Sequence, residues 1–336
     1  MRILFWGTPE FAVPPLRALI GEGHEVISVV TGPDKPRGRS RSRLDPSPVK
    51  VVAMQEGVPV LQPEKPRGDE FMAAMEKLAP DISVVVAYGH ILPRVAIDLP
   101  RLGTLNIHAS LLPALRGAGP IQAAILGGLS ETGVTIMQMV PQLDAGPMLH
   151  TLRTPIHSDE TYGELHDRLT EIGALGIVQA LAMIDSGVAR PITQDDEAAT
   201  YAPKVDRTMT RLDFSKDADA VSRTTRAFDP RPGAFATLRD VEIKLFGASV
   251  VGDGSDEPLD DTVRASPPGT VRAIDVEGLL VRCGSGAVRF CGVQPSGKSR
   301  LAPLDWARGR GVTIGDRFDE PLAPDYLSAH DAGGRI

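Results

Sequence analysis

The sequence has few aromatic residues and only two cysteines. Aromatic side chains make up 4% of the 336 residues, so aliphatic side chains must fill most of the core. Cys283 and Cys291 are too few for a disulfide framework or a four-ligand zinc site, and no other cluster of metal ligands is visible. We therefore expect no metal and a reducing, cytoplasmic location.

Long apolar runs are also missing. No segment approaches the roughly 20 apolar residues of a membrane-spanning helix, and the N-terminal apolar run is cut short by Gly7 and Pro9. Neither a signal peptide nor a membrane span is expected. The net charge of −7 argues against a generally basic nucleic-acid-binding surface but leaves room for a local basic patch.

The first part of the chain alternates predicted strands with predicted helices. Apolar runs predict strands at 2–6, 26–30, 58–61, 82–87, 103–107, 133–139 and 148–154. Helical spacing predicts helices at about 9–20, 49–57, 69–79 and 160–186. This alternation predicts an α/β fold with a Rossmann-like, mostly parallel sheet and helices on both faces.

The pattern changes near residue 195, where the chain becomes polar. After a helix at about 217–227, the sequence predicts five short strands, typical of a small β-barrel, at 234–238, 241–248, 269–274, 279–282 and 288–293. We expect four parts: a domain at 1–195, a linker at 196–208, a second domain at 209–320 and a disordered tail at 321–336.

Polar residues follow two predicted strands, where open parallel sheets bind their ligands. Asn106 and His108 lie at the end of the strand predicted at 103–107 and, being two residues apart on an extended segment, face the same side. An amide donor and an imidazole suit oxyanion stabilisation and proton transfer. On residue types alone, a solvated turn with a capping Asn and a surface His is the plainer interpretation.

Asp144 follows the strand predicted at 133–139. An Asp before Ala-Gly-Pro often only forms a turn, but near His108 its carboxylate would orient the imidazole and complete a catalytic trio. Arg116 either holds a substrate anion or forms a salt bridge. A nicotinamide-dependent oxidoreductase is disfavoured, because Gly7-Thr-Pro9 lacks the later glycines of the dinucleotide fingerprint.

A basic segment stands out in this acidic chain. Within residues 32–48, among Gly, Pro and Ser, lie five basic residues: Lys35, Arg37, Arg39, Arg41 and Arg43. The composition predicts an exposed, mobile loop. It is either a solvated charged loop or a flexible contact to RNA phosphates or a stacked base.

Several ordered segments, spread from about residue 2 to 318, match one known family. They are Gly7–Ala12, Pro33–Pro36, Pro46–Lys50, Val85–Gly89, Asn106–Pro113, Arg116–Ile121, Thr132–Met139, Leu143–Gly146, Thr200–Lys204 and Ala227–Pro230. On these motifs the chain resembles the folate-dependent formyltransferases.

The resemblance implies 10-formyltetrahydrofolate as the formyl donor, initiator methionyl-tRNA as the acceptor, an OB-like C-terminal barrel and no metal. It assigns catalysis to Asn106, His108 and Asp144. The folate contacts that it implies are Ser110, Leu111, Leu112, Pro113, Val86 and Leu92. The tRNA contacts that we expect are Arg37, Arg39, Arg41, Arg43 and Lys204. We expect the protein to be a monomer.

Two positions depart from the family pattern. Ala114-Leu115 replaces a usually bulky or basic pair, and Arg231 stands where the family usually has a Trp between two prolines. The alternative function is a related formyltransferase acting on a small amine, either glycinamide ribonucleotide or an amino-sugar nucleotide. The barrel, the linker and the basic segment argue against it, since small acceptors need none of them. An RNA-binding module without catalysis is disfavoured by the intact trio.

Overall fold

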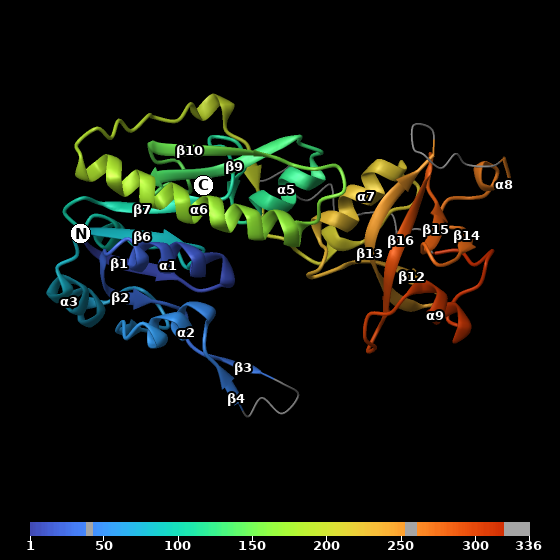
Figure 1. Cartoon of the computed structure of the whole chain (residues 1–336), viewed down its shortest axis with the longest axis horizontal. Coiled ribbons are helices and arrows are strands. Elements are labelled where there is room, and N and C mark those ends of the chain that lie inside the picture. Colours follow the sequence, from blue (N-terminus) through green and yellow to red (C-terminus); the bar gives the residue numbers. More distant parts are fainter. Residues whose placement is uncertain (38–42, 253–260, 319–336) are drawn as a thin grey trace. The chain divides into compact units, whose positions relative to one another are not determined.

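The computed structural model describes residues 1–37, 43–252 and 261–318 of the chain (Figure 1). They form two compact units. The first unit comprises Met1–Ala124, Ser130–Ile156 and Glu164–Lys204; the second comprises Ile125–Leu129, His157–Gly163 and the described chain from Val205 on. The domain boundaries predicted at 195 and 208 stay predictions, and the tail at 321–336 lies outside the described residues.

A seven-stranded sheet of order β10-β9-β7-β6-β1-β2-β5 forms the centre of the first unit. Its strands are β1 (Arg2–Gly7), β2 (Glu25–Val30), β5 (Val60–Leu61), β6 (Ile82–Val86), β7 (Thr104–His108), β9 (Glu131–Gln138) and β10 (Met148–Pro155). Strands β1, β2, β5, β6 and β7 run parallel to one another, whereas β9 pairs antiparallel with both β7 and β10. The predicted mostly parallel sheet is therefore confirmed.

Helices pack on both faces of this sheet. They are α1 (Val13–Gly21), which follows η1 (Glu10–Ala12), then α2 (Pro48–Gln55), α3 (Asp69–Leu78), α4 (Arg94–Ile97), α5 (Pro120–Leu126) and α6 (Tyr162–Asp185). Trp6 packs with Met75 of α3 in one hydrophobic cluster. On the opposite face α6 approaches closely, since a Cβ at Gly173 would stand 3.0 Å from Ile107 Cγ2. The sequence did not predict the short helices α4 and α5.

A short hairpin connects β2 to α2. Its strands, β3 (Lys35–Arg37) and β4 (Arg43–Asp45), pair antiparallel (Figure 1). The loop predicted over 32–48 is thus partly a hairpin among the described residues. The Ser47 side chain then caps α2 by accepting a hydrogen bond of 3.0 Å from Lys50 N, and Pro48 supplies the preset backbone angle of a first helical residue.

The second unit contains a five-stranded antiparallel sheet of order β12-β13-β16-β15-β14. Its elements are η3 (Thr208–Thr210), α7 (Ala218–Ala227), β12 (Ala234–Leu238), β13 (Val241–Val251), α8 (Asp261–Arg264), β14 (Val271–Ile274), β15 (Leu279–Arg282), β16 (Ala287–Pro295) and α9 (Pro303–Arg308). Asp217 caps α7 by accepting a hydrogen bond of 2.6 Å from Ala220 N. The small barrel-like domain predicted from five short strands is confirmed.

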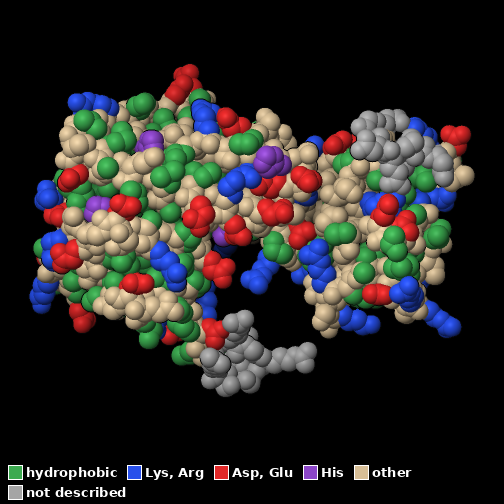
Figure 2. Space-filling view, in the orientation of Figure 1, with side chains coloured by type: hydrophobic (Ala, Val, Ile, Leu, Met, Phe, Trp, Pro, Cys, Tyr) green, Lys and Arg blue, Asp and Glu red, His purple; other side chains and the backbone are tan. Residues whose placement is uncertain are grey.

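The surface carries charges of both signs. Figure 2 shows acidic and basic side chains interspersed over the visible face, in keeping with a net charge of only −7 on 336 residues. Within the described part of the chain, we find no helix with the length and apolar character needed to span a membrane.

Candidate active site

The site lies at the carboxyl end of β7. In the sheet, Trp6 of β1, Val85 of β6 and Asn106 of β7 stand side by side in register. Because side chains alternate along a strand, Asn106 and His108 project from the face opposite Ile107, which packs against α6. The same-side arrangement predicted for these two residues therefore follows from the register of β7.

Asp144 comes to this edge from the loop after β9. Its Oδ1 lies 3.5 Å from Asn106 Nδ2, and its Oδ2 lies 3.7 Å from His108 Nδ1. The His108 and Asp144 side chains are only 6% and 12% exposed. A separation of 3.7 Å is too long for a hydrogen bond but close enough for charge to be felt. The three residues predicted as catalytic thus converge, while their roles stay a prediction.

The loop that carries Asp144 has an unusual backbone. Asp144 itself has a φ of 49°, in the left-handed region, which costs a non-glycine residue roughly 1–2 kcal/mol. Its Oδ2 accepts a hydrogen bond of 2.9 Å from Gly117 N. A Cβ at Gly146 would stand 1.7 Å from Gln138 O, so only glycine fits there. The carboxylate is therefore held by a tightly constrained turn.

The second ring nitrogen of His108 faces a backbone carbonyl. Nε2 lies 2.9 Å from Leu115 O, which can only accept, so Nε2 is the donor in this contact. Leu115 N in turn donates to Thr200 Oγ1 at 2.9 Å. Leu115 makes both contacts through its backbone, so the departure from the family pattern at Ala114-Leu115 does not by itself alter them.

The predicted folate-contacting segment 110–113 is tied to β9. Thr135 Oγ1 accepts from Leu112 N at 3.2 Å and donates to Ser110 O at 2.7 Å. Ser110 Oγ donates to Ala114 O at 2.6 Å. Leu111 lies against Gly133, where a Cβ would come within 2.6 Å of its Cδ2. The turn after His108 is consequently fixed in place beside the trio.

The other predicted folate contacts lie in the interior of the first unit. Val86 is fully buried, and Leu92 is buried in the cluster with Trp6, Val85 and Tyr88. The Tyr88 hydroxyl is buried without a hydrogen-bond partner among the described residues, and burial raises the pKa of Tyr88 to about 12. The sequence reasoning did not single out this phenol, although it lies in the matched segment Val85–Gly89.

The predicted tRNA contacts are only partly described. Arg37 and Arg43 occupy paired positions in β3 and β4, whereas Arg39 and Arg41 lie outside the described residues. Lys204 is exposed at the end of the first unit.

A hydrogen-bonded network stands at the base of the β3–β4 hairpin. Lys50 Nζ lies 2.7 Å from both Asp34 Oδ2 and Gln62 Oε1, and Gln62 Nε2 donates to Asp34 Oδ1 at 2.7 Å and to Gly32 O at 2.9 Å. These hydrogen bonds, that from Lys50 foremost, lower the pKa of Asp34. The sequence reasoning missed this network, although all but Gln62 lie in or next to the matched segments.

Arg116 forms a salt bridge in the structure. It is 3% exposed, its Nη2 lies 2.7 Å from Asp196 Oδ1, and its Nε donates to Gln194 Oε1 at 3.0 Å. Of the two interpretations left open for Arg116, the structure favours the salt bridge. Among the described residues there is also no group of three or more His, Cys, Asp or Glu side chains placed to hold a metal ion.

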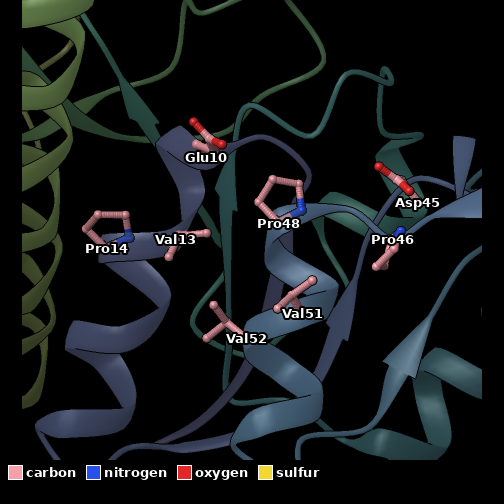
Figure 3. Close-up of a pocket in the computed structure, with 8 residues that line it drawn as sticks. All are labelled: Glu10, Val13, Pro14, Asp45, Pro46, Pro48, Val51 and Val52. Carbon is pink, nitrogen blue, oxygen red and sulfur yellow. The ribbon is translucent and has the colours of Figure 1, made fainter. Parts of the chain in front are cut away.

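An open hollow of about 610 Å³ lies between α1 and α2, and none of the trio residues lines it (Figure 3). Val13, Val51 and Val52 give it an apolar lining, and Figure 3 shows the carboxylates of Glu10 and Asp45 along one side. Two carboxylates would repel a phosphate, so this hollow is not suited to hold the phosphate backbone of a nucleic acid.

Two protein-family models match separate parts of the sequence. The formyl transferase model matches residues 1–181, and the model of the formyl transferase C-terminal domain matches residues 204–311. The chain belongs to the formyl transferase family. Two similar curated members are the methionyl-tRNA formyltransferases of Aromatoleum aromaticum and Methylococcus capsulatus, with 47% and 46% identity. The matches cover 95% and 93% of this chain and 97% and 98% of those proteins.

Solved structures of formyl transferase-like fold are more distant in sequence. HypX from Aquifex aeolicus, solved in complex with tetrahydrofolic acid, has a TM-score of 0.64 at 20% identity. The match covers 96% of this chain but 51% of HypX, so this chain spans about half of the HypX length. The sugar 3N-formyl transferase WlaRD has a TM-score of 0.64 at 15% identity, with coverage of 89% and 99%. At these identities the likeness supports the fold alone.

Proposed function

We propose that this chain transfers the formyl group of 10-formyltetrahydrofolate to the α-amine of methionyl-initiator tRNA, giving N-formylmethionyl-tRNA for translation initiation. The observation that carries the proposal is the convergence of Asn106, His108 and Asp144 at one sheet edge. It occurs in a chain that matches proteins named methionyl-tRNA formyltransferase over nearly their whole length.

The trio suits the two demands of formyl transfer. When the amine nitrogen attacks the formyl carbon, the carbonyl oxygen becomes the oxyanion of a tetrahedral intermediate. Asn106 Nδ2 and a proton on His108 Nδ1, the ring nitrogen that does not contact Leu115 O, would stabilise this oxyanion, and losing one such donor typically costs on the order of 100-fold in rate. As the bond from the formyl carbon to the folate nitrogen breaks, a proton passes from the amine to that nitrogen. Asp144 would hold His108 and relay the proton.

The residues near the trio fit a ligand that carries a polar, flat ring. Ser110, Leu111, Leu112 and Pro113 lie directly after His108, and Val86 and Leu92 lie at or after the end of the neighbouring strand β6. The buried hydroxyl of Tyr88, beside Leu92 and without a partner among the described residues, is a group that such a ring could satisfy. We assign the folate contacts to these residues on that basis.

The tRNA contacts are assigned to the basic hairpin and to Lys204. The hairpin strands carry Arg37 and Arg43, and the arginines between them, Arg39 and Arg41, complete the basic segment. Binding that depends on phosphate contacts weakens steeply with salt. The domains proposed are a catalytic domain at 1–195, a linker at 196–208 and a tRNA-binding domain at 209–320, in a cytoplasmic monomer.

One assay tests the proposal. Purified protein is given 10-formyltetrahydrofolate and, in parallel, methionyl-initiator tRNA, glycinamide ribonucleotide or an amino-sugar nucleotide, with His108→Ala as the inactive control. We expect formylation of the tRNA alone. Formylation of a small amine with none of the tRNA would replace the proposed acceptor, and equal product from His108→Ala would remove the catalytic assignment.

A further inference from the structure

The conformation of Asp144 requires outside support. Its left-handed backbone, at a φ of 49°, is costly for a residue with a side chain. Its carboxylate has a single short hydrogen bond in the described structure, from Gly117 N to Oδ2, while the contacts to Asn106 and His108 are 3.5 and 3.7 Å long. Further contacts must therefore hold the turn around Asp144 in its left-handed conformation.

Gln194 holds the backbone of that turn. This residue lies between α6 and η2 (Asp196–Ala198), about fifty positions further along the chain, and is only 6% exposed. Its Nε2 donates to Asp144 O at 2.8 Å and to Gly146 O at 2.7 Å. Because a side-chain amide has two N–H groups, each carbonyl receives one of them. A single side chain thus fixes the backbone on both sides of residue 145.

Arg116 fixes the orientation of the Gln194 amide. Its Nε donates to Gln194 Oε1 at 3.0 Å. Were the amide turned over, its oxygen would face the two carbonyl oxygens and its NH₂ group would face a guanidinium, so only one orientation is favourable. The next residue after Arg116 is Gly117, whose N–H holds the Asp144 carboxylate. The segment Arg116–Gly117 therefore supports Asp144 in two ways. The Arg116 side chain orients Gln194, and the Gly117 backbone N–H binds the Asp144 carboxylate.

The geometry points to Gln194 as a positioning residue for formyl transfer, with Arg116 setting the orientation of its amide. The amide keeps the 144–146 turn in the conformation that places the Asp144 carboxylate between Asn106 and His108. The inference rests on the proposed function. It differs from a structural role, because it requires that the folded enzyme lose turnover when the two donated hydrogen bonds are removed.

The test uses Gln194→Glu in the full-length protein. The carboxylate can still accept from Arg116, but it has no N–H for Asp144 O and Gly146 O. We expect kcat for methionyl-tRNA to fall roughly 10- to 100-fold, since a misplacement of about 1 Å in a catalytic group has effects of this size. The KM for methionyl-tRNA should not change. Gln194→Met, which lacks both donors and the acceptor, should show at least the same loss.

The matched control is Gln179→Glu. Gln179 is an exposed residue of α6 that pairs with His150, so the same chemical change there should leave kcat unchanged. If the wild-type protein formylates methionyl-tRNA and folded Gln194→Glu keeps its kcat, the inference is wrong and the proposed function stands. Failure of both Gln194 variants to fold would also contradict it, by making Gln194 a stability residue. A wild-type protein without activity would instead overturn the proposed function, and the inference with it.

Discussion

Two aspartates at the same edge of the sheet are held in opposite ways. Asp34, after β2, makes a 2.7 Å ion pair with Lys50 and a 2.7 Å hydrogen bond with Gln62. Asp144, after β9, has one neutral backbone donor and only long contacts to its polar side-chain neighbours. Asp144 is nevertheless the more buried, with 12% of its side chain exposed against 23% for Asp34.

The difference separates a carboxylate with both oxygens in short hydrogen bonds from one with an oxygen that can still take a new partner. A carboxylate whose two oxygens are both engaged by short hydrogen bonds is well stabilised and has little capacity for new partners. At Asp144 the hydrogen bond from Gln194 goes to the backbone carbonyl oxygen. The carboxylate oxygen Oδ1 has only a 3.5 Å contact, with Asn106 Nδ2. We therefore expect changes around Asp144 to affect turnover, and changes around Asp34 to affect the hairpin and the use of tRNA.

The largest effect should come from His108→Ala. In the proposed mechanism, loss of the ring removes an oxyanion donor and the proton-transfer partner of Asp144, so kcat should fall by on the order of 100-fold or more. Steady-state formylation of methionyl-tRNA measures it. His150→Ala, which changes a histidine paired with Gln179 on α6, should retain the wild-type rate. Equal losses in the two variants would remove His108 from the catalytic site.

A smaller effect is expected from Lys50→Met at the base of the hairpin. Without the ammonium, Asp34 and Gln62 lose their common partner, and the β3–β4 strands lose a fixed point. The KM for tRNA should rise roughly tenfold, equivalent to about 1.4 kcal/mol, with kcat unchanged. Lys65→Met, at an exposed lysine, is the control. If Lys50→Met lowered kcat and left the KM for tRNA unchanged, the hairpin base would affect turnover and not the use of tRNA, contrary to this prediction.

Tyr88→Phe should stabilise the protein without its ligands. The buried hydroxyl has no partner among the described residues, so its removal should raise the free energy of unfolding by about 1–3 kcal/mol. The pKa of Tyr88 is raised to about 12, above the ordinary value of about 10. The wild-type protein should therefore lose stability relative to Tyr88→Phe as the pH rises from about 10 to about 12. Denaturant unfolding at several pH values measures both, and a destabilised variant would show that the hydroxyl is bonded.

The smallest effect concerns the acid stability of the hairpin base. Hydrogen bonds from Lys50 and then Gln62 lower the pKa of Asp34 below its ordinary value of about 3.9. A lowered folded-state pKa contributes stability that is complete above the unfolded-state value and is lost as the pH falls through the folded-state value. The stability difference between wild type and Asp34→Asn should thus shrink below about pH 4. A difference that stays constant through this range would contradict the network.

Hydrophobic periodicity predicted most strands and the long helices, because each buries a continuous apolar face. It did not predict the reversed direction of β9, since strand direction leaves no mark on periodicity. The two-residue strands β8 (Arg116–Gly117) and β11 (Tyr201–Ala202) pair across more than eighty positions and have no local signal. The trio was found from residue types at strand ends together with a family resemblance. Gln194 was not, because its function depends on contacts with residues far away in the sequence.

The most direct test makes the same change at both aspartates. Single-turnover formyl transfer to saturating methionyl-initiator tRNA is measured for Asp144→Asn and Asp34→Asn, with thermal unfolding of each as a check on folding. We expect Asp144→Asn to be folded and slower by roughly 100-fold or more, while Asp34→Asn transfers at the wild-type rate. A folded Asp144→Asn protein with the wild-type rate would contradict the assignment of the trio.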